Sequence, residues 1–254
     1  MAIDIDPAWA VCVYLLSLRL SVLLVMTPIF SSLSGLVTVR ILFTIALSAV
    51  LVSGMETRPT LLPLSVGPLI AASFVELVVG AVLAFGVFAA FGVFAVAGKI
   101  LDVQSGFGIG SVFDPVTRAG APLFATMLSL LAVTVFFAMN GHHALLRGIA
   151  FSLQQIPPGS GFSSLAVEPA VRQFGLMFSL GTALVAPVMF CLFLVEAALA
   201  IVSRVLPQMN VFMVGMPVKL VTGLSVFGLT VGTIAPVMGK AYASIFSYWE
   251  QVLR

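Results

Sequence analysis

Charge is what this sequence has least of. Only 8% of its 254 residues are Asp, Glu, Lys or Arg, whereas a soluble domain carries roughly 25%. So few charges cannot cover a water-facing surface, and 61% of the residues are hydrophobic. We therefore expect much of the chain to lie in lipid or inside a larger assembly. The formal net charge of +2, with Lys and Arg scattered singly, argues against a nucleic-acid partner.

The motifs of common enzymes are also missing. No Gly-Lys-Ser/Thr phosphate loop occurs, and the alternate glycines at 106, 108 and 110 meet Ser111 where a dinucleotide fingerprint needs glycine. His142 and His143 are adjacent, so on a helix they would point about 100° apart, with no Cys or carboxylate at ligand spacing. Cys12 and Cys191 lie in apolar runs and are interpreted as small hydrophobic side chains. We predict no enzyme activity, no cofactor and no metal site.

Long apolar runs are what the chain does have. Six of them cover residues 8–30, 41–55, 69–98, 121–139, 174–202 and 220–238. Such continuous runs predict helices rather than the alternating strands of a membrane barrel. Asp4 and Asp6 stand where a cleaved signal would carry Lys or Arg, so we expect the first run to remain in the mature protein. The fold class is accordingly all-α, an integral membrane protein, here taken as one domain over residues 1–254.

These runs do not describe six ordinary membrane spans. The second has only fifteen residues, against about 20 needed to cross the hydrocarbon core, and the third and fifth reach about thirty. With alternating topology, four Lys or Arg would lie on one side and five on the other, so no positive-inside bias appears. We expect helical hairpins and bent helices inside a larger helical assembly.

Prolines and glycines divide the runs. Residues 54–68 predict a loop, and residues 140–172 a long polar connection broken at Pro157 and Pro158. Before that break, Leu145, Ile149 and Leu153 recur at helical spacing and predict a short amphipathic helix. Residues 204–217 predict a tight connector.

Glycines recur every six residues at 80, 86, 92 and 98, beside two copies of the pentapeptide FGVFA. Six residues turn a helix by about 600°, so these glycines spiral around it. We interpret them as contact points for neighbours on several sides.

Residues 105–122, SGFGIGSVFDPVTRAGAP, are the most unusual stretch. Alternate glycines and large apolar side chains predict an apolar loop, and Asp114-Pro115 predicts a helix start. Such a loop at membrane depth must be buried in protein or line a cavity. A plain connecting turn remains the alternative.

Charged residues also fall inside or beside the apolar runs: Arg19, Glu76, Glu196 and Lys219. Since charge in lipid is costly, such residues usually face protein or water. For Glu76 and Glu196 two interpretations stay open, a structural pair or hydrogen-bonded group and, less favoured, a transporter's proton relay.

A family pattern runs through these residues in chain order: Arg19, Pro28, Phe30, Glu76, Gly80, Gly98, Asp102, Gln104, Gly106, Asp114, Pro115, NGHH at 140–143, Ser152, Pro158, Gly159, Ala186, Pro187, Arg204, Pro207, Gln208, Asn210, Phe212, Pro217 and Gly223. In this order and spacing they resemble the FliR/SctT family, the flagellar biosynthetic protein FliR and its counterpart in virulence secretion systems. The chain departs from the family pattern at Ser105, where many relatives have methionine, and at Glu196 and Lys219, where others are uncharged.

The resemblance implies a subunit of the type III protein-export gate in the bacterial inner membrane, at the flagellar basal body. Its implied partners are FliP-like and FliQ-like subunits, an FlhB-type switch subunit, unfolded export substrates and membrane lipid. The central loop would seal the pore, with a plug formed by Gly106, Phe107, Gly108, Ile109, Gly110, Ser111, Val112, Phe113, Asp114 and Pro115. The expected buried polar or assembly residues are Arg19, Glu76, Asp102, Gln104, Glu196, Arg204 and Lys219.

Two other functions stay open. Glu76, Glu196 and broken helices would suit a secondary transporter for a small solute or ion, although no half-to-half similarity is visible. A scaffold without a conduit is the third. With no internal pairing evident for its charges, we further expect the chain to need its partners for stability, and Glu76 and Glu196 to face other chains or trapped water.

Overall fold

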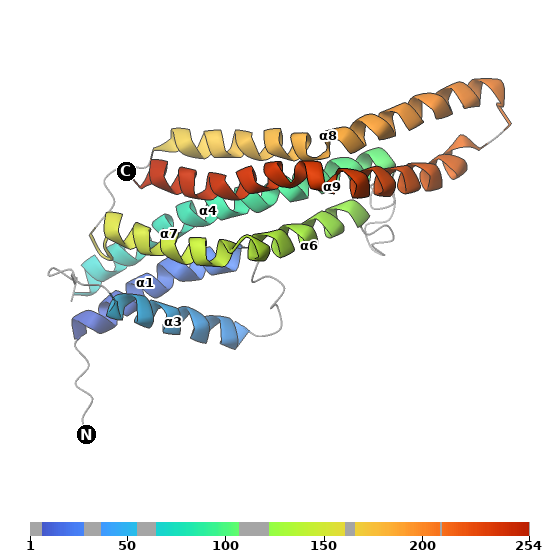
Figure 1. Ribbon diagram of the computed structural model, residues 1–254. Helices are drawn as coiled ribbons and strands as arrows, with labels where there is room; N and C mark the ends of the chain where they lie inside the picture. Colours follow the sequence, from blue (N-terminus) through green and yellow to red (C-terminus); the bar gives the residue numbers. More distant parts are fainter. Residues whose placement is uncertain are drawn as a thin grey trace. The chain divides into compact units, whose positions relative to one another are not determined.

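The structure is a computed structural model that describes residues 7–27, 37–54, 65–106, 122–160, 166–208 and 210–253. Within these ranges the chain forms helices and no strand (Figure 1). The helices are α1 (Pro7–Met26), α3 (Val37–Ser53), α4 (Val66–Ser105), α6 (Leu123–Ala138), α7 (Gly141–Gln155), α8 (Val167–Val205) and α9 (Val211–Val252). Each of the six apolar runs lies in a different helix, and α7 is the predicted amphipathic helix.

Among the described residues, four helices are long and apolar enough to cross a membrane: α1, α4, α8 and residues Met213–Val252 of α9. The bent pair α6 and α7 would make a fifth span if counted as one, whereas α3 has 17 residues. The prediction of an all-helical membrane protein is confirmed. The 40 residues of α4 would measure about 60 Å at 1.5 Å per residue, roughly twice the hydrocarbon core. The described helices therefore do not form six conventional spans.

Some predicted helix ends are wrong. The connector expected at 204–217 is confined to residues 206–210, because Pro217 lies inside α9. The last helix runs on to Val252, well beyond the apolar run that ended at residue 238. Proline costs less in a membrane helix because neighbouring helices can satisfy the carbonyl it leaves free. Pro68 lies in the first turn of α4, where proline is tolerated.

The described chain divides into two compact units. Unit 1 comprises Met1–Ala89, Asn140–Gln173 and Ser244–Arg254, and unit 2 comprises Ala90–Met139 and Phe174–Ala243. Helices α4, α8 and α9 each contribute residues to both units. The single-domain assignment stays a prediction.

In unit 1, α3 packs against α1 through the buried residues Thr44, Ser48 and Val52, spaced four apart. The two hydroxyl groups donate to their own helix, to the carbonyl oxygens of Arg40 and Thr44, at 2.8 and 2.7 Å. Large apolar side chains lie on the exposed face of α3, such as Leu42 at 62% exposure. α3 thus buries small polar residues and exposes large apolar ones, which is the reverse of the arrangement on a helix of a soluble protein. This arrangement suits an apolar environment.

Aromatic residues fill the core of each unit. In unit 1, Trp249 is fully buried, and its Nε1 donates to the carbonyl oxygen of Leu83 at 3.0 Å. In unit 2, the ring of Tyr242 contacts Phe91, Phe94 and Phe136, and its hydroxyl donates to the carbonyl oxygen of Ala132 at 2.6 Å. Each polar atom thus finds a backbone acceptor, as burial requires.

The spiral of glycines on α4 meets a different helix at each step. Within unit 1, Gly80 contacts α1 and Gly86 contacts α9; within unit 2, Gly92 contacts α8 and Gly98 contacts α6. A Cβ at Gly80 would lie 2.6 Å from the carbonyl oxygen of Arg19. The interpretation that these glycines serve close packing on several sides is confirmed.

Candidate functional site

Two polar centres lie in the two units, and the first is the pair Arg19–Glu76. Arg19 on α1 and Glu76 on α4 both belong to unit 1 and are 0% and 1% exposed. The Arg19 Nε donates to Glu76 Oε2 at 2.6 Å. Burying both charges in an apolar helix bundle is tolerable only if further hydrogen bonds satisfy their remaining groups.

Those further hydrogen bonds come from the end of α7. The Arg19 Nη2 donates to the carbonyl oxygen of Ile156 at 3.0 Å, and Nη1 lies 3.4 Å from the carbonyl oxygen and hydroxyl of Ser152. From the turn that follows, the Gly159 N–H donates to Glu76 Oε1 at 3.1 Å. Gly159 has a φ of 79°, which favours glycine. The ion pair therefore caps the C-terminal end of α7 and joins α1, α4 and this turn.

This arrangement corrects an expectation. Glu76 was predicted to face another chain or trapped water because the apolar runs did not describe ordinary membrane spans, although a structural pair was the favoured interpretation of its charge. It pairs instead with Arg19, 57 positions earlier in the sequence. The local sequence around either residue does not indicate this pairing. The contact forms only when α1 and α4 pack side by side.

The second centre is the C-terminal end of α4, in unit 2. Asp102 is 0% exposed, and its two carboxylate oxygens accept hydrogen bonds from the backbone N–H groups of Phe124 and Ala125, at 2.9 and 3.0 Å. Pro122, the residue before α6, provides no side-chain cap. Asp102 therefore acts as the N-terminal cap of α6 and places negative charge at the positive end of the helix dipole. Asp102 thereby joins the end of α4 to the start of α6, which are the described elements on either side of segment 107–121.

Lys219 lies at the same end of α4. From α9, its Nζ donates to the carbonyl oxygen of Gln104 at 3.3 Å and pairs with Glu196 Oε1 on α8 at 3.2 Å. The Gln104 side chain reaches α8, where its Nε2 donates to the carbonyl oxygen of Met189 at 2.8 Å. Lys219 is 16% exposed and Glu196 58%. We call Gln104, Glu196 and Lys219 the α4-end cluster.

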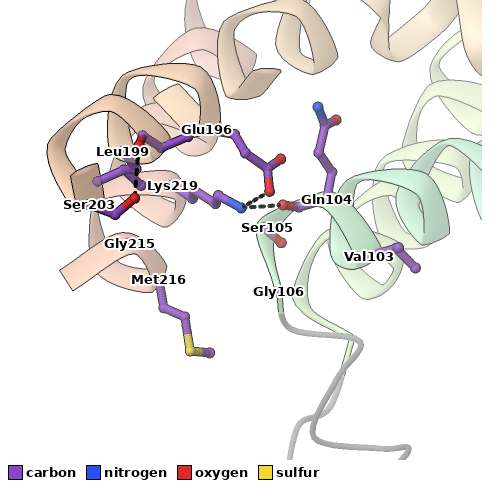
Figure 2. A pocket seen from close by; sticks show the side chains of 11 residues that line it. Val103, Gln104, Ser105, Gly106, Glu196, Leu199, Ser203, Gly215, Met216 and Lys219 are labelled. Carbon is purple, nitrogen blue, oxygen red and sulfur yellow. Dashed lines mark hydrogen bonds and ion pairs between the residues drawn. The ribbon is translucent and has the colours of Figure 1, made fainter. Parts of the chain in front are cut away.

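A cavity of about 640 Å³ opens beside the α4-end cluster. Figure 2 shows the Lys219 ammonium between the Glu196 carboxylate and the Gln104 main chain, with Gly106 directly after the end of α4. The lining comes from α4, α8 and α9 and comprises Val103, Gln104, Ser105, Gly106, Glu196, Leu199, Ala200, Ser203, Gly215, Met216 and Lys219. A volume of this size is in the range of ligand pockets.

The predicted site residues are thus distributed over several places. Arg19 and Glu76 form the first centre, while Asp102 and the α4-end cluster lie together in unit 2. Arg204 is exposed in the last turn of α8 and belongs to neither centre. Of the predicted plug, only Gly106 is described, with a φ of 91°. Phe107, Gly108, Ile109, Gly110, Ser111, Val112, Phe113, Asp114 and Pro115 lie outside the described residues.

Sequence reasoning missed the roles of Ser152, Ile156 and Gly159. Pro158 and Gly159 had been noted only as a helix break, and nothing in their pattern pointed to Arg19 or Glu76. It also missed Trp249, because α9 was expected to end earlier. Among the described residues, no group of three or more His, Cys, Asp or Glu could hold a metal ion.

Comparisons with known proteins cover almost the whole chain. The family model described as bacterial export proteins, family 1, matches residues 10–245. The flagellar biosynthetic protein FliR of Bacillus subtilis (strain 168) is 34% identical over 222 residues, which are 86% of this chain and 83% of that protein. The flagellar biosynthetic protein FliR of Escherichia coli (strain K12) is 25% identical over 70% of this chain and 69% of its own length. The Yop proteins translocation protein T of Yersinia pestis is 28% identical over 57% of this chain and 56% of its own.

Proposed function

This chain belongs to the bacterial export proteins, family 1, and on that basis we propose that it is a subunit of the type III export apparatus of a flagellum. The observation that carries the proposal is the 34% identity to a flagellar biosynthetic protein over 86% of the chain. The flagellar relatives named above cover 86% and 70% of the chain, and the Yop translocation protein 57%, which favours the flagellar system.

The chain would act in the bacterial inner membrane, at the flagellar basal body, as one helical subunit of the gate. FliP-like and FliQ-like subunits would complete the pore for unfolded proteins, beside an FlhB-type switch subunit. Large apolar side chains on α8 and α9, such as Phe190 and Leu229 at 63% and 84% exposure, support an environment of lipid or partner helices. The long helices, which exceed the thickness of the hydrocarbon core, support a place partly outside it.

Two experiments test this role. Deleting the gene should abolish swimming and the appearance of flagellin in the medium, and a plasmid copy should restore both. Purification from mild detergent should recover FliP-like and FliQ-like proteins with the tagged chain, and co-expression with them should raise its level and protease resistance. Undiminished flagellin export in the deletion strain would refute the role. A protease-resistant monomer from the chain alone would refute the need for assembly.

We further propose, from the sequence and the family resemblance, that residues 106–115 seal the closed pore. Apolar side chains such as Phe107, Ile109 and Phe113 would leave ions no replacement for their hydration shell. Deleting residues 106–110 should yield an assembled gate that leaks ions and small solutes, with export reduced less than sealing. The measurement is small-solute influx in cells, with assembly checked by co-purification.

A tight, fully assembled deletion variant would show that the segment is only a connector. Should the deletion not assemble, the double substitution F107S/I109S keeps the length of the chain and tests the apolar seal directly.

The alternative function, a transporter for small solutes, has little support from the contacts of its two candidate carboxylates. Glu76, the first candidate for a proton relay, is held by Arg19 and by the Gly159 N–H, and Glu196 pairs with Lys219. Proteoliposomes containing the chain together with its co-purified partners separate the two functions, because a transporter would accumulate its solute against a gradient there and an export gate would not.

A further inference from the structure

We propose that Lys219 is a positioning residue for the C-terminal end of α4. Its ammonium holds the last turn of α4 against α8 and α9, and so sets the direction in which the chain leaves the helix at Gly106. The consequence for sealing rests on the proposed function, but the contact itself can be tested without it.

The carbonyl groups at the end of α4 show why a cation belongs there. The last carbonyl groups of any helix lack partners within the helix. Here the Asp102 oxygen accepts from the Ser105 hydroxyl at 3.2 Å, the Val103 oxygen from the Gly106 N–H at 3.2 Å, and the Gln104 oxygen from Lys219 at 3.3 Å. Only the third of these donors comes from another helix. Lys219 therefore joins a backbone group of this helix end to α9, in addition to the side-chain contacts of Asp102 with α6 and of Gln104 with α8.

Electrostatics favour a positive charge at this point. The C-terminal end of a helix carries partial negative charge, and the Glu196 carboxylate adds a full one on the other side of the ammonium. The two contacts differ in burial, because the hydrogen bond to Gln104 is part-buried whereas the Glu196 side chain is 58% exposed. An exposed partner contributes little, so we assign most of the positioning to the contact with the Gln104 carbonyl oxygen.

The cavity explains why the contact is needed. Small residues line its walls around the end of α4: Ser105, Gly106, Ala200, Ser203 and Gly215. Leu199 and Met216 also line the cavity, and the Met216 Cγ lies 3.8 Å from the place where a Cβ on Gly106 would lie. The Asp102 carboxylate holds the last turn to α6 and the Gln104 side chain holds it to α8, whereas on the cavity side the Lys219 hydrogen bond holds it to α9.

Two explanations of Lys219 can be separated by reversing the pair. If the ion pair with Glu196 were the main contact, the double variant E196K/K219E would restore it. If the α4 carbonyl group is the main contact, the reversed pair places a carboxylate against a carbonyl oxygen and the negative end of a helix, and fails. Arginine at 219 keeps both contacts, whereas methionine keeps the length and loses both.

The test is the labelling rate of a thiol at position 105 by N-ethylmaleimide, in membranes that contain the complete apparatus. Ser105 is 0% exposed, and S105C changes little in size. The parent protein carries S105C with both native cysteines replaced by alanine. Reagent reaches position 105 only when the last turn of α4 moves away from its neighbours. Loss of a hydrogen bond to a charged group raises the population of that exposed state by about tenfold or more, so K219M should label about tenfold faster than the parent.

The other variants sharpen the result. K219R should label at the parent rate, E196Q less than about threefold faster, and E196K/K219E as fast as K219M. Parent-like labelling of K219M would overturn the proposal, and so would restored protection in E196K/K219E, because it would assign the role to the ion pair. If K219M does not accumulate, K219L takes its place, since it too loses both contacts and should label about tenfold faster. A rate equal to the parent's would again overturn the proposal.

Loss of flagellin export in all strains would leave these labelling rates interpretable, because none of them depends on transport. A failed proposed function and a failed Lys219 contact are therefore distinguished by the same set of strains.

Discussion

Removing the charge of Arg19 should destabilise the protein strongly, and removing the charge of Glu76 as well should restore part of the stability. In the variant R19M, the Glu76 carboxylate stays 1% exposed without its cation, and the carbonyl oxygen of Ile156 loses its donor. Breaking a buried ion pair by removing one partner costs about 3–5 kcal/mol. The double variant R19M/E76Q removes the stranded charge, while the amide oxygen that it introduces can still accept from the Gly159 N–H.

The magnitude follows from these contacts. We expect R19M to cost about 3–5 kcal/mol and R19M/E76Q about 2 kcal/mol less than that. For chains of this size, 1 kcal/mol corresponds to roughly 2–4 °C in Tm. R19M should therefore lower Tm by about 6–20 °C, and adding E76Q should raise it again by about 4–8 °C.

The assay is thermal unfolding of the complex in detergent, followed by intrinsic fluorescence, with the amount of chain in the membrane as a second readout. The matched control is R172M, the same substitution at an exposed arginine of α8, which should change stability by less than about 1 kcal/mol. The reasoning is refuted if R19M behaves like R172M, or if E76Q adds to the damage of R19M rather than reducing it.

Three further substitutions probe the packing of unit 2. G98A forces a methyl group into the backbone of α6 and should cost about 1–3 kcal/mol. Its control is G228A, where a Cβ meets nothing within 4 Å and the change should be neutral or stabilising by up to about 1 kcal/mol. Equal effects of the two variants on Tm would contradict the packing argument. Y242F loses the 2.6 Å hydrogen bond to α6 and should lower the free energy of unfolding in denaturant by about 1 kcal/mol. Its control is Y14F, at an exposed tyrosine, which should lower it by almost nothing. A Y242F loss no larger than that of Y14F would show that the Tyr242 hydroxyl does not contribute. D102A removes the cap of α6 and should cost about 0.5–2 kcal/mol, with D102N in between, measured as amide exchange in the first turn of α6; unchanged exchange would rule out the cap.

Much of the helical architecture follows from local pattern. A continuous apolar run of fifteen residues or more can satisfy its backbone in lipid only as a helix, so each of the six runs became one. Leu145, Ile149 and Leu153 indicated α7 because spacing of four places them on one face, and all three are buried in unit 1. The glycines at 80, 86, 92 and 98 indicated contacts on several sides because six-residue spacing turns around the helix.

Helix ends were less predictable than helices. Proline stops a helix in water, and Pro217 was interpreted in that way, yet α9 continues through it and through Pro236. The segment after position 238 contains charged residues and was therefore left out of the last apolar run. It nevertheless continues α9, where Trp249 is buried and hydrogen-bonded to α4. Whether such residues continue a helix depends on neighbours that the local pattern does not contain.

The partners of the buried charges were decided by packing alone. Arg19 could be recognised as an unusual charge in an apolar run, but its pairing with Glu76 and with the end of α7 brings together residues 57 and 137 positions apart. Asp102 could be read as a polar residue near a helix end, whereas its function as the cap of α6 requires Phe124 and Ala125 to arrive beside it. A charge in a nonpolar interior must find a partner somewhere, so composition shows that a pair exists; only the three-dimensional arrangement of the helices selects which groups can reach one another within hydrogen-bond distance.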